Sequence, residues 1–497
     1  GSREDCRMEV ESDTEFCTSG DIAALEEAAR IGISLGPPLL KIQPETAQSV
    51  QQTLPQQEND GVEPDVEASS VPTPSGRFIP SPRETPIHQY CTDTNVVSNS
   101  TMASRMASCH SSRLKDLLDL ARRSSGDTET EKHNKLKIAW LERTRWANTY
   151  EVPEGSDSSS PLLLDADVWY MAWETFQQRA HAGEIFGKPI VIKQKFQDSD
   201  MYEPHGYMLA LKDKFAVQQL DVQNSETGEC RKMDVKDFCA VRFDTTKVDD
   251  QTLAATSNTI NLRKIANADA PLLTRMSRFR LLETLSQRAA NIGPGKRISS
   301  QVNDVSDCLG FDLLGFEGAF TRPHVDALMG TWVRCLSGEK AWIFAPGMDA
   351  KDWDDFARDG PSWCPAGKGR VIILEKDDVL LMPPGVRTLH TVFTLGPSLM
   401  EGGMLWDECN IPALLDELLW VAQNQPCTNE AITYQLPSII DILEVWVEEH
   451  GERLSALGGD TNCVETIKLG IGKLRDLGCQ CTSACRKNPG CRCSIYE

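Results

Sequence analysis

The segment TRPHVDALMGTWVRCLSGEK, residues 321–340, carries the strongest chemical signal in this chain. It places His324 and Asp326 two residues apart and ends on Lys340. Side chains alternate between the faces of a β-strand, so on a strand the imidazole and the carboxylate point the same way. They would then supply two of the three ligands of a 2-His-1-carboxylate iron(II) site, which leaves open positions for a co-substrate and oxygen.

The third ligand has few candidates, because only two of the eight histidines, His390 and His450, lie beyond His324. His450 falls in an acidic stretch with a helical pattern. His390 follows an apolar run, the Pro-Pro-Gly turn at 383–385 and the start of a second β-branched run, which together predict strand, turn and strand. A barrel whose late strands return beside the early ones would bring His390 to the same metal.

These residues resemble a known family. The set consists of Thr321, His324, Asp326, Gly338-Glu339-Lys340, Pro383-Pro384-Gly385, His390 and Gly402-Gly403. It is similar to the JmjC domain, an iron(II) and 2-oxoglutarate oxygenase, and in particular to chromatin-associated fungal JmjC proteins, including modulators of DNA methylation. The resemblance implies an α+β fold around a double-stranded β-helix, a jelly-roll or cupin-like barrel with flanking helices.

The resemblance also implies roles for these residues. His324, Asp326 and His390 would be the catalytic iron ligands. Lys340 would offer its ammonium and Thr321 its hydroxyl to the far carboxylate of 2-oxoglutarate, through charge-assisted hydrogen bonds. Hydroxylation of an N-methyl group by such a centre releases formaldehyde and leaves a demethylated lysine.

Composition limits the classes of partner. The chain has 497 residues and a net charge of −22, with a pI near 4.9. This charge argues against nonspecific DNA binding by the bulk surface and is compatible with a basic substrate such as a histone tail, although it also serves solubility alone. No apolar run is long enough to span a membrane. The 17 cysteines without a secretory signal favour reduced thiols inside a cell, and the resemblance implies the nucleus.

Patterning and the JmjC resemblance together predict six segments. Residues 1–110 are expected to be a mostly disordered acidic arm with one amphipathic helix at 21–35, and residues 111–160 a helical segment. Residues 161–306 are expected to lead into the barrel, with helices at 167–186 and 271–289 around a buried strand at 187–196. The JmjC core is expected at 307–410 and a helical cap at 411–476, including one helix at 438–457. The loop 361–370 is expected to be exposed.

The last segment, residues 477–497, carries a second signal, the cysteines Cys479, Cys481, Cys485, Cys491 and Cys493. Five thiols among Gly, Pro, Arg and Lys cannot form a core, and Cys-x-Cys pairs suit tetrahedral zinc. One of the five is spare, or Cys463 or Cys409 joins them, or further ligands lie elsewhere; a flexible reduced tail is the alternative. Nearby Arg475, Arg486, Lys487 and Arg492 leave contact with DNA or a partner open.

The sequence therefore favours a nuclear JmjC-type oxygenase of chromatin, with a histone methyl-lysine as the first substrate hypothesis. Trp332 or Trp406 could cage its methylammonium. A chromatin adaptor without turnover is an alternative, favoured by the inserted residues in VRTLH and by Met404 after Gly403. Such an adaptor would recruit a DNA-binding partner and limit the spread of heterochromatin. A protein side-chain hydroxylase is the third hypothesis.

Overall fold

A computed structural model of the chain describes residues 77–79, 102–123, 128–155, 161–197, 202–215, 218–260, 262–264, 270–290, 305–430, 433, 435–458 and 462–476. The helix expected at 21–35 and the five clustered cysteines of segment 477–497 lie outside these residues. Within them, no helix combines the length and apolar character needed to cross a membrane.

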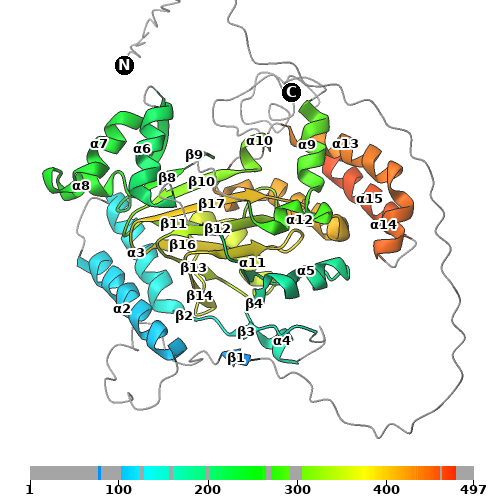
Figure 1. The fold of residues 1–497 in the computed structure, drawn as a ribbon, viewed down its shortest axis with the longest axis horizontal. Helices are drawn as coiled ribbons and strands as arrows, with labels where there is room; N and C mark the ends of the chain where they lie inside the picture. The colour runs from blue at the N-terminus through cyan, green and yellow to red at the C-terminus, as the bar shows by residue number, and fades with distance from the viewer. Residues whose placement is uncertain are drawn as a thin grey trace, which may run out of the picture. The chain divides into compact units, whose positions relative to one another are not determined.

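The described residues form an α+β fold with two large β-sheets (Figure 1). The larger sheet has the order β1-β3-β4-β5-β15-β12-β17-β10-β8-β6-β7, and β9 pairs with β10. Its strands are β1 (Arg77–Ile79), β3 (Thr149–Glu151), β4 (Val168–Ala172), β5 (Ile190–Lys193), β6 (Gln219–Gln223), β7 (Cys230–Asp234), β8 (Asn258–Ile260), β9 (Leu262–Arg263), β10 (Phe311–Gly315), β12 (Thr331–Ser337), β15 (Asp378–Met382) and β17 (Ser398–Met404).

The smaller sheet has the order β11-β16-β13-β14-β2. Its strands are β2 (Thr144–Trp146), β11 (Phe320–His324), β13 (Lys340–Phe344), β14 (Gly369–Leu374) and β16 (His390–Thr394). One cluster of buried side chains combines residues of both sheets, among them Val333 and Cys335 from β12 and Trp342 and Val392 from β13 and β16. The two sheets therefore share a core between their facing sides, stabilised by burial of apolar surface.

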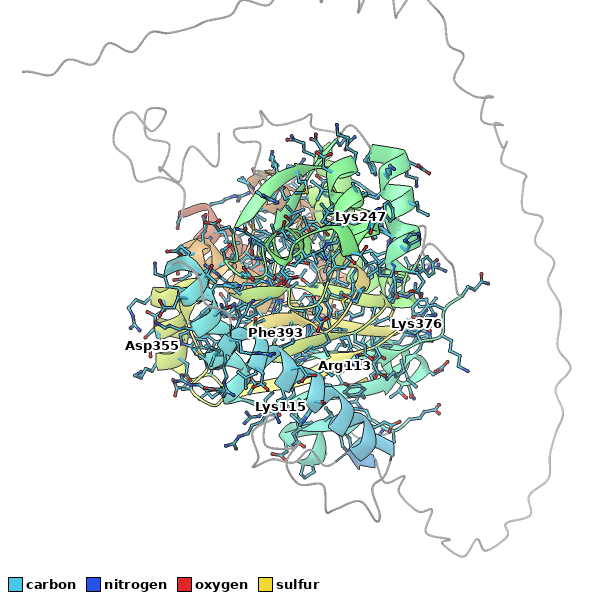
Figure 2. The ribbon with its side chains drawn as sticks, turned by 90° about the vertical axis from the view of Figure 1, so that its left-hand side faces the viewer. Arg113, Lys115, Lys247, Asp355, Lys376 and Phe393 are labelled. Atoms are coloured by element: carbon cyan, nitrogen blue, oxygen red, sulfur yellow. The ribbon has the colours of Figure 1, made fainter. Side chains whose placement is uncertain are left out.

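Helices cover the outer faces of both sheets (Figure 1). The α-helices are α2 (Met102–Arg123), α3 (Thr128–Arg143), α4 (Pro161–Asp165), α5 (Trp173–His181), α6 (Pro204–Phe215), α7 (Val235–Phe243), α8 (Asp250–Ala254), α9 (Leu281–Ala290), α10 (Val305–Cys308), α11 (Ala350–Asp359), α12 (Ile411–Gln423), α13 (Leu436–Glu449), α14 (Gly451–Gly458) and α15 (Cys463–Asp476). Helices α2, α3, α9, α12, α13 and α15 share a core with Phe320 and Phe393 of the smaller sheet. On this side lies Arg113 of α2, which Figure 2 labels. It pairs with Glu339 in the turn before β13.

The prediction of a helix at 167–186 is wrong for its first part. Residues Val168–Ala172 form strand β4, which pairs in parallel with β3 and β5, and helix α5 begins only at Trp173. Val-Trp-Tyr-Met is a sequence of good strand formers. Pairing on both sides and burial of Val168 and Met171 therefore decide the outcome over helical spacing.

Two other expected helices are interrupted. At 271–289, two 3₁₀ turns (Leu272–Arg275 and Ser277–Phe279) precede α9, because Arg278 is held by Asp407 and by the carbonyls of Ala180 and Glu184. At 438–457, the chain breaks at His450 between α13 and α14.

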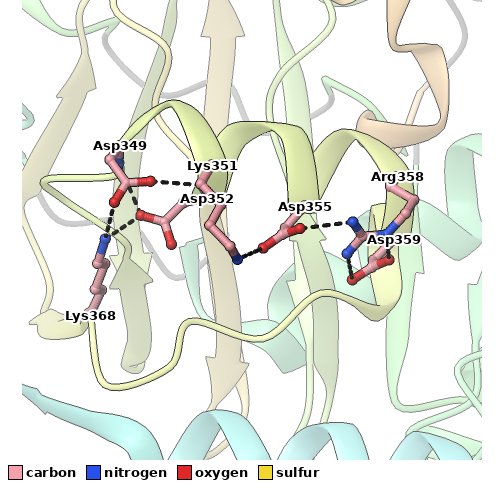
Figure 3. A network of polar contacts seen from close by, with 7 residues as sticks. All are labelled: Asp349, Lys351, Asp352, Asp355, Arg358, Asp359 and Lys368. Carbon is pink, nitrogen blue, oxygen red and sulfur yellow. Dashed lines mark hydrogen bonds and ion pairs between the residues drawn. The ribbon is translucent and has the colours of Figure 1, made fainter.

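The expected exposed loop at 361–370 is partly anchored. Trp363 is buried, and its carbonyl accepts a hydrogen bond of 3.1 Å from Trp140 Nε1. Lys368 in the same loop pairs with Asp352 of α11 (Figure 3). Asp349 caps this helix reciprocally with Asp352, which is the local reason that α11 begins there.

Candidate metal centre

The two candidate histidine ligands lie at the paired ends of neighbouring strands. His324 is the last residue of β11 and His390 the first residue of β16, and the register places them directly opposite each other. Directly opposed residues of an antiparallel pair share one face of the sheet. The ring centroids are 4.2 Å apart, and both side chains are buried.

Asp326 completes the group. Its Oδ1 lies 3.8 Å from His324 Nε2 and 3.9 Å from His390 Nε2. One ligand atom from each of the three residues lies within 4.8 Å of the other two. The structure thus brings together the three side chains that the sequence nominated, with atoms of the types that bind a transition metal.

Backbone carbonyls orient both imidazoles. His324 Nδ1 lies 2.7 Å from the carbonyl oxygen of Arg322, and His390 Nδ1 lies 3.0 Å from that of Thr388. A proton on each Nδ1 satisfies these carbonyls and leaves the Nε2 lone pairs for a metal. Burial, and next the proximity of His390, lower the pKa of His324 to about 3, so this ligand is neutral at physiological pH.

The Asp326 carboxylate is oriented from its other oxygen. Thr331 Oγ1 donates a 2.6 Å hydrogen bond to Asp326 Oδ2, which leaves Oδ1 facing the histidines. The turn between the two residues is tight, since a Cβ at Gly330 would lie 2.4 Å from the carbonyl oxygen of Leu405. Trp406 Nε1 donates to the carbonyl of Leu328 in the same turn, at 2.9 Å.

This role of Trp406 corrects the expectation that it cages a methylammonium. Trp406 is fully buried and Trp332 is 4% exposed, inside an apolar cluster with Trp169 and Leu381. Neither ring offers an open face to a substrate. Trp342 is the aromatic side chain that touches the centre, stacked on the His390 ring with centroids 5.3 Å apart.

The electrostatics of the centre favour a cation. A second carboxyl, Glu430, lies near Asp326; burial, and next the Asp326 charge, raise its pKa to about 7. Its segment is joined to the ligand strand through a 2.9 Å hydrogen bond from Val325 N to the carbonyl of Cys427. Two imidazoles and a carboxylate beside a second carboxyl fit a divalent metal ion, iron(II) among them.

The candidate co-substrate anchors lie further along the same face. Lys340 is 4% exposed, and burial lowers its pKa to about 8. Among the described residues no carboxylate pairs with its ammonium. The strand register places Lys340 opposite Thr394, Trp342 opposite Val392, and Phe344 opposite His390. Thr321 is opposite Val392 on the other side of β16, so it lies between the levels of His390 and Lys340.

The sequence did not nominate Thr331, Thr394 or Trp342. The position of Thr394 could have been predicted. It follows His390 by four residues, and every second residue of a strand lies on the same face. Trp342 follows Lys340 by two residues on β13 and therefore also lies on the same face as that candidate residue. Thr331 had no such signal, since its contact depends on the turn at 326–330.

Replacing Thr331 by valine is expected to weaken Mn(II) binding about 10- to 100-fold, because the carboxylate ligand loses the donor that orients it. Isothermal titration calorimetry of the purified protein measures the change. Thr256→Val is the matched control, since Thr256 is equally buried but bonds helix carbonyls of the α8 region. An unchanged affinity in Thr331→Val would contradict the assignment of Asp326 as a ligand.

Comparison with known proteins finds a similar curated protein. No protein-family model matches the chain. The chain is similar to a curated protein of Curvularia clavata described as KK-1 biosynthesis cluster protein D, with 41% identity over 392 residues. The match covers 77% of this chain and 39% of the relative, so the chain spans well under half of that protein's length. This likeness and the two β-sheets are compatible with a cupin-like or oxygenase fold.

Proposed function

We propose that this chain is a JmjC-type iron(II)/2-oxoglutarate-dependent oxygenase. The observation that carries the proposal is the group of His324, Asp326 and His390, whose ligand atoms lie within 4.8 Å of one another. The strand order supports it: β10, β12, β15 and β17 adjoin one another in the larger sheet, and β11, β13, β14 and β16 in the smaller. This distribution of eight consecutive strands is what a double-stranded β-helix of the JmjC kind requires.

In this proposal the side chains have separate binding roles. His324, Asp326 and His390 would hold iron(II), and Lys340 and Thr321 would hold the far carboxylate of 2-oxoglutarate. With dioxygen, these two cofactors supply oxidative hydroxylation of a substrate C–H bond, coupled to formation of succinate and carbon dioxide. Trp342 would keep the His390 ring in place. Its side chain belongs to the core that the two sheets share, and its buried Nε1 has no acceptor among the described residues.

Two substrate classes follow from different observations. The JmjC resemblance favours a nuclear enzyme of chromatin that demethylates a histone lysine, and the acidic chain is compatible with such a basic substrate. The relative described as a biosynthesis cluster protein favours a second candidate, hydroxylation of a biosynthetic intermediate. Hydroxylation of a protein side chain is a further candidate, which follows from the JmjC resemblance. A chromatin adaptor without turnover remains the non-enzymatic alternative.

Anaerobic titration with Fe(II) and then 2-oxoglutarate, followed by oxygen and a succinate assay, tests the activity. Both ligands are expected to bind, and succinate is expected to accumulate slowly without substrate and faster with the true one. Histone peptides carrying methyl-lysine are tested for formaldehyde. Hydroxylated product without formaldehyde would favour the second class, and a protein that binds neither ligand would favour the adaptor.

A further inference from the structure

Residues 386–389, between the Pro-Pro-Gly turn and His390, form neither helix nor strand. The orientation of a ligand nevertheless depends on them, because the carbonyl oxygen of Thr388 lies 3.0 Å from His390 Nδ1. Thr388 Oγ1 donates to the carbonyl of Val386, and the side chain of Leu389 is buried. A carbonyl fixes an imidazole only if its own peptide is held in place. The side chains that hold this segment therefore bear on the metal centre.

Arg387 ties this segment to two helices. Its guanidinium carbon lies 4.0 Å from the ring centre of Trp420 in α12 and 4.7 Å from that of Trp353 in α11. Its Nε donates a hydrogen bond to Glu417, also in α12. The side chains of Arg387 and Glu417 are only 18% and 19% exposed. Both the stacking and the ion pair are therefore partly shielded from water, which strengthens them.

The same aromatic group also reaches the other segment that carries ligands. Trp420 stacks on Phe356 of α11, with ring centroids 6.4 Å apart. The carbonyl of Phe356 accepts a 3.4 Å hydrogen bond from Cys427 Sγ. The carbonyl of Cys427 in turn accepts the 2.9 Å hydrogen bond from Val325 N, between the histidine and the carboxylate of the first ligand pair. The rings around the guanidinium are thus joined to both ligand segments.

We propose that Arg387 is a positioning residue of the metal centre, which sets the orientation of the His390 ring through the peptide of Thr388; this rests on the proposed function. A planar guanidinium lies flat on an indole and pairs with a carboxylate at the same time, whereas the ammonium of lysine is a compact charge on a flexible stem. Arginine therefore fixes both the place and the direction of the segment. The residues inserted before His390 then serve to hold the ligand rather than to disable the centre.

Titration of the full chain with Mn(II) tests this role, with the affinity read by calorimetry and the geometry by the electron paramagnetic resonance spectrum of the bound ion. Mn(II) is the probe because thiolates are poor ligands for it. Arg387→Met is expected to weaken binding about 10- to 100-fold, as losses of groups that orient a ligand do, and to change the spectrum. Arg387→Lys keeps the charge beside Glu417 and should recover part of the affinity. Wild-type affinity and an unaltered spectrum in Arg387→Met would overturn the inference.

Arg242→Met is the matched control. Arg242 also stacks on a ring, with its guanidinium carbon 3.9 Å from the centre of Phe316, and it bonds backbone carbonyls of the α8 region. Its loss should lower the free energy of unfolding in urea and leave Mn(II) binding unchanged. If the control loses Mn(II) affinity as Arg387→Met does, the role of Arg387 is structural only and the inference is wrong.

Failure of the proposed function gives a different result, because the wild-type chain itself would then bind no Mn(II). Should Arg387→Met fail to fold, Glu417→Gln decides, since it weakens the same contact and keeps the size of the side chain. It is expected to reduce the Mn(II) affinity severalfold. An unchanged affinity in Glu417→Gln would then overturn the inference.

Discussion

Replacing His390 by alanine is expected to lower the affinity for Mn(II) or Fe(II) at least a hundredfold. The substitution removes one of three ligand atoms, and changes that merely disorient a ligand already cost 10- to 100-fold. The remaining pair, His324 and Asp326, would bind metal as a weak two-ligand site. Anaerobic titration of the purified variant, read by calorimetry and by the metal retained after desalting, measures the loss.

The matched control for this substitution is His450→Ala. His450 lies at the end of α13, stacked on Trp446 with ring centroids 4.3 Å apart, and belongs to no group of candidate ligands in the described residues. Its replacement should leave the metal affinity unchanged. Equal metal binding by His390→Ala and the wild type would refute the centre, provided that circular dichroism shows both to be folded.

The His-x-Asp spacing could be read from sequence because it depends on a local rule, the alternation of side chains along a strand. His390 was also within reach, since few histidines remained and a Pro-Pro-Gly turn preceded it. These three residues do lie together in the structure. The two histidines lie at strand ends and are paired by the register of β11 and β16, and Asp326 follows the end of β11 by two residues.

Other features could not be predicted from the sequence, for physical reasons. Trp406 was expected at a substrate mouth, but its indole is buried and braces the turn that carries Asp326. Its burial depends on packing from parts of the chain that are distant in the sequence, such as helix α9. Strand β4 was missed because its neighbours β3 and β5 determine its conformation.

Replacing Lys340 is expected to give the second large effect. The substitution should raise the stability of the fold and weaken the binding of 2-oxoglutarate. Burial lowers its pKa to about 8 from the usual 10.5, so the folded state binds this proton less tightly than the unfolded state. The destabilisation by the buried ammonium is fully present below pH 8. It is removed as the pH rises from 8 to about 10.5, because in this range the folded state has lost the proton and the unfolded state still keeps it. The difference corresponds to roughly 3 kcal/mol, as an upper estimate for the cost of the buried charge.

Lys340→Met is therefore expected to raise the free energy of unfolding at pH 7 by about 2–3 kcal/mol, and to abolish the thermal stabilisation by 2-oxoglutarate in the presence of Mn(II). The gain should shrink toward zero near pH 10.5. Urea unfolding at several pH values measures the first effect and thermal unfolding with ligand the second. Lys232→Met, at an exposed position of β7, should change neither. A Lys340→Met variant less stable than wild type at pH 7 would mean that the ammonium is already paired in the apoprotein, which would leave it unavailable to a carboxylate ligand.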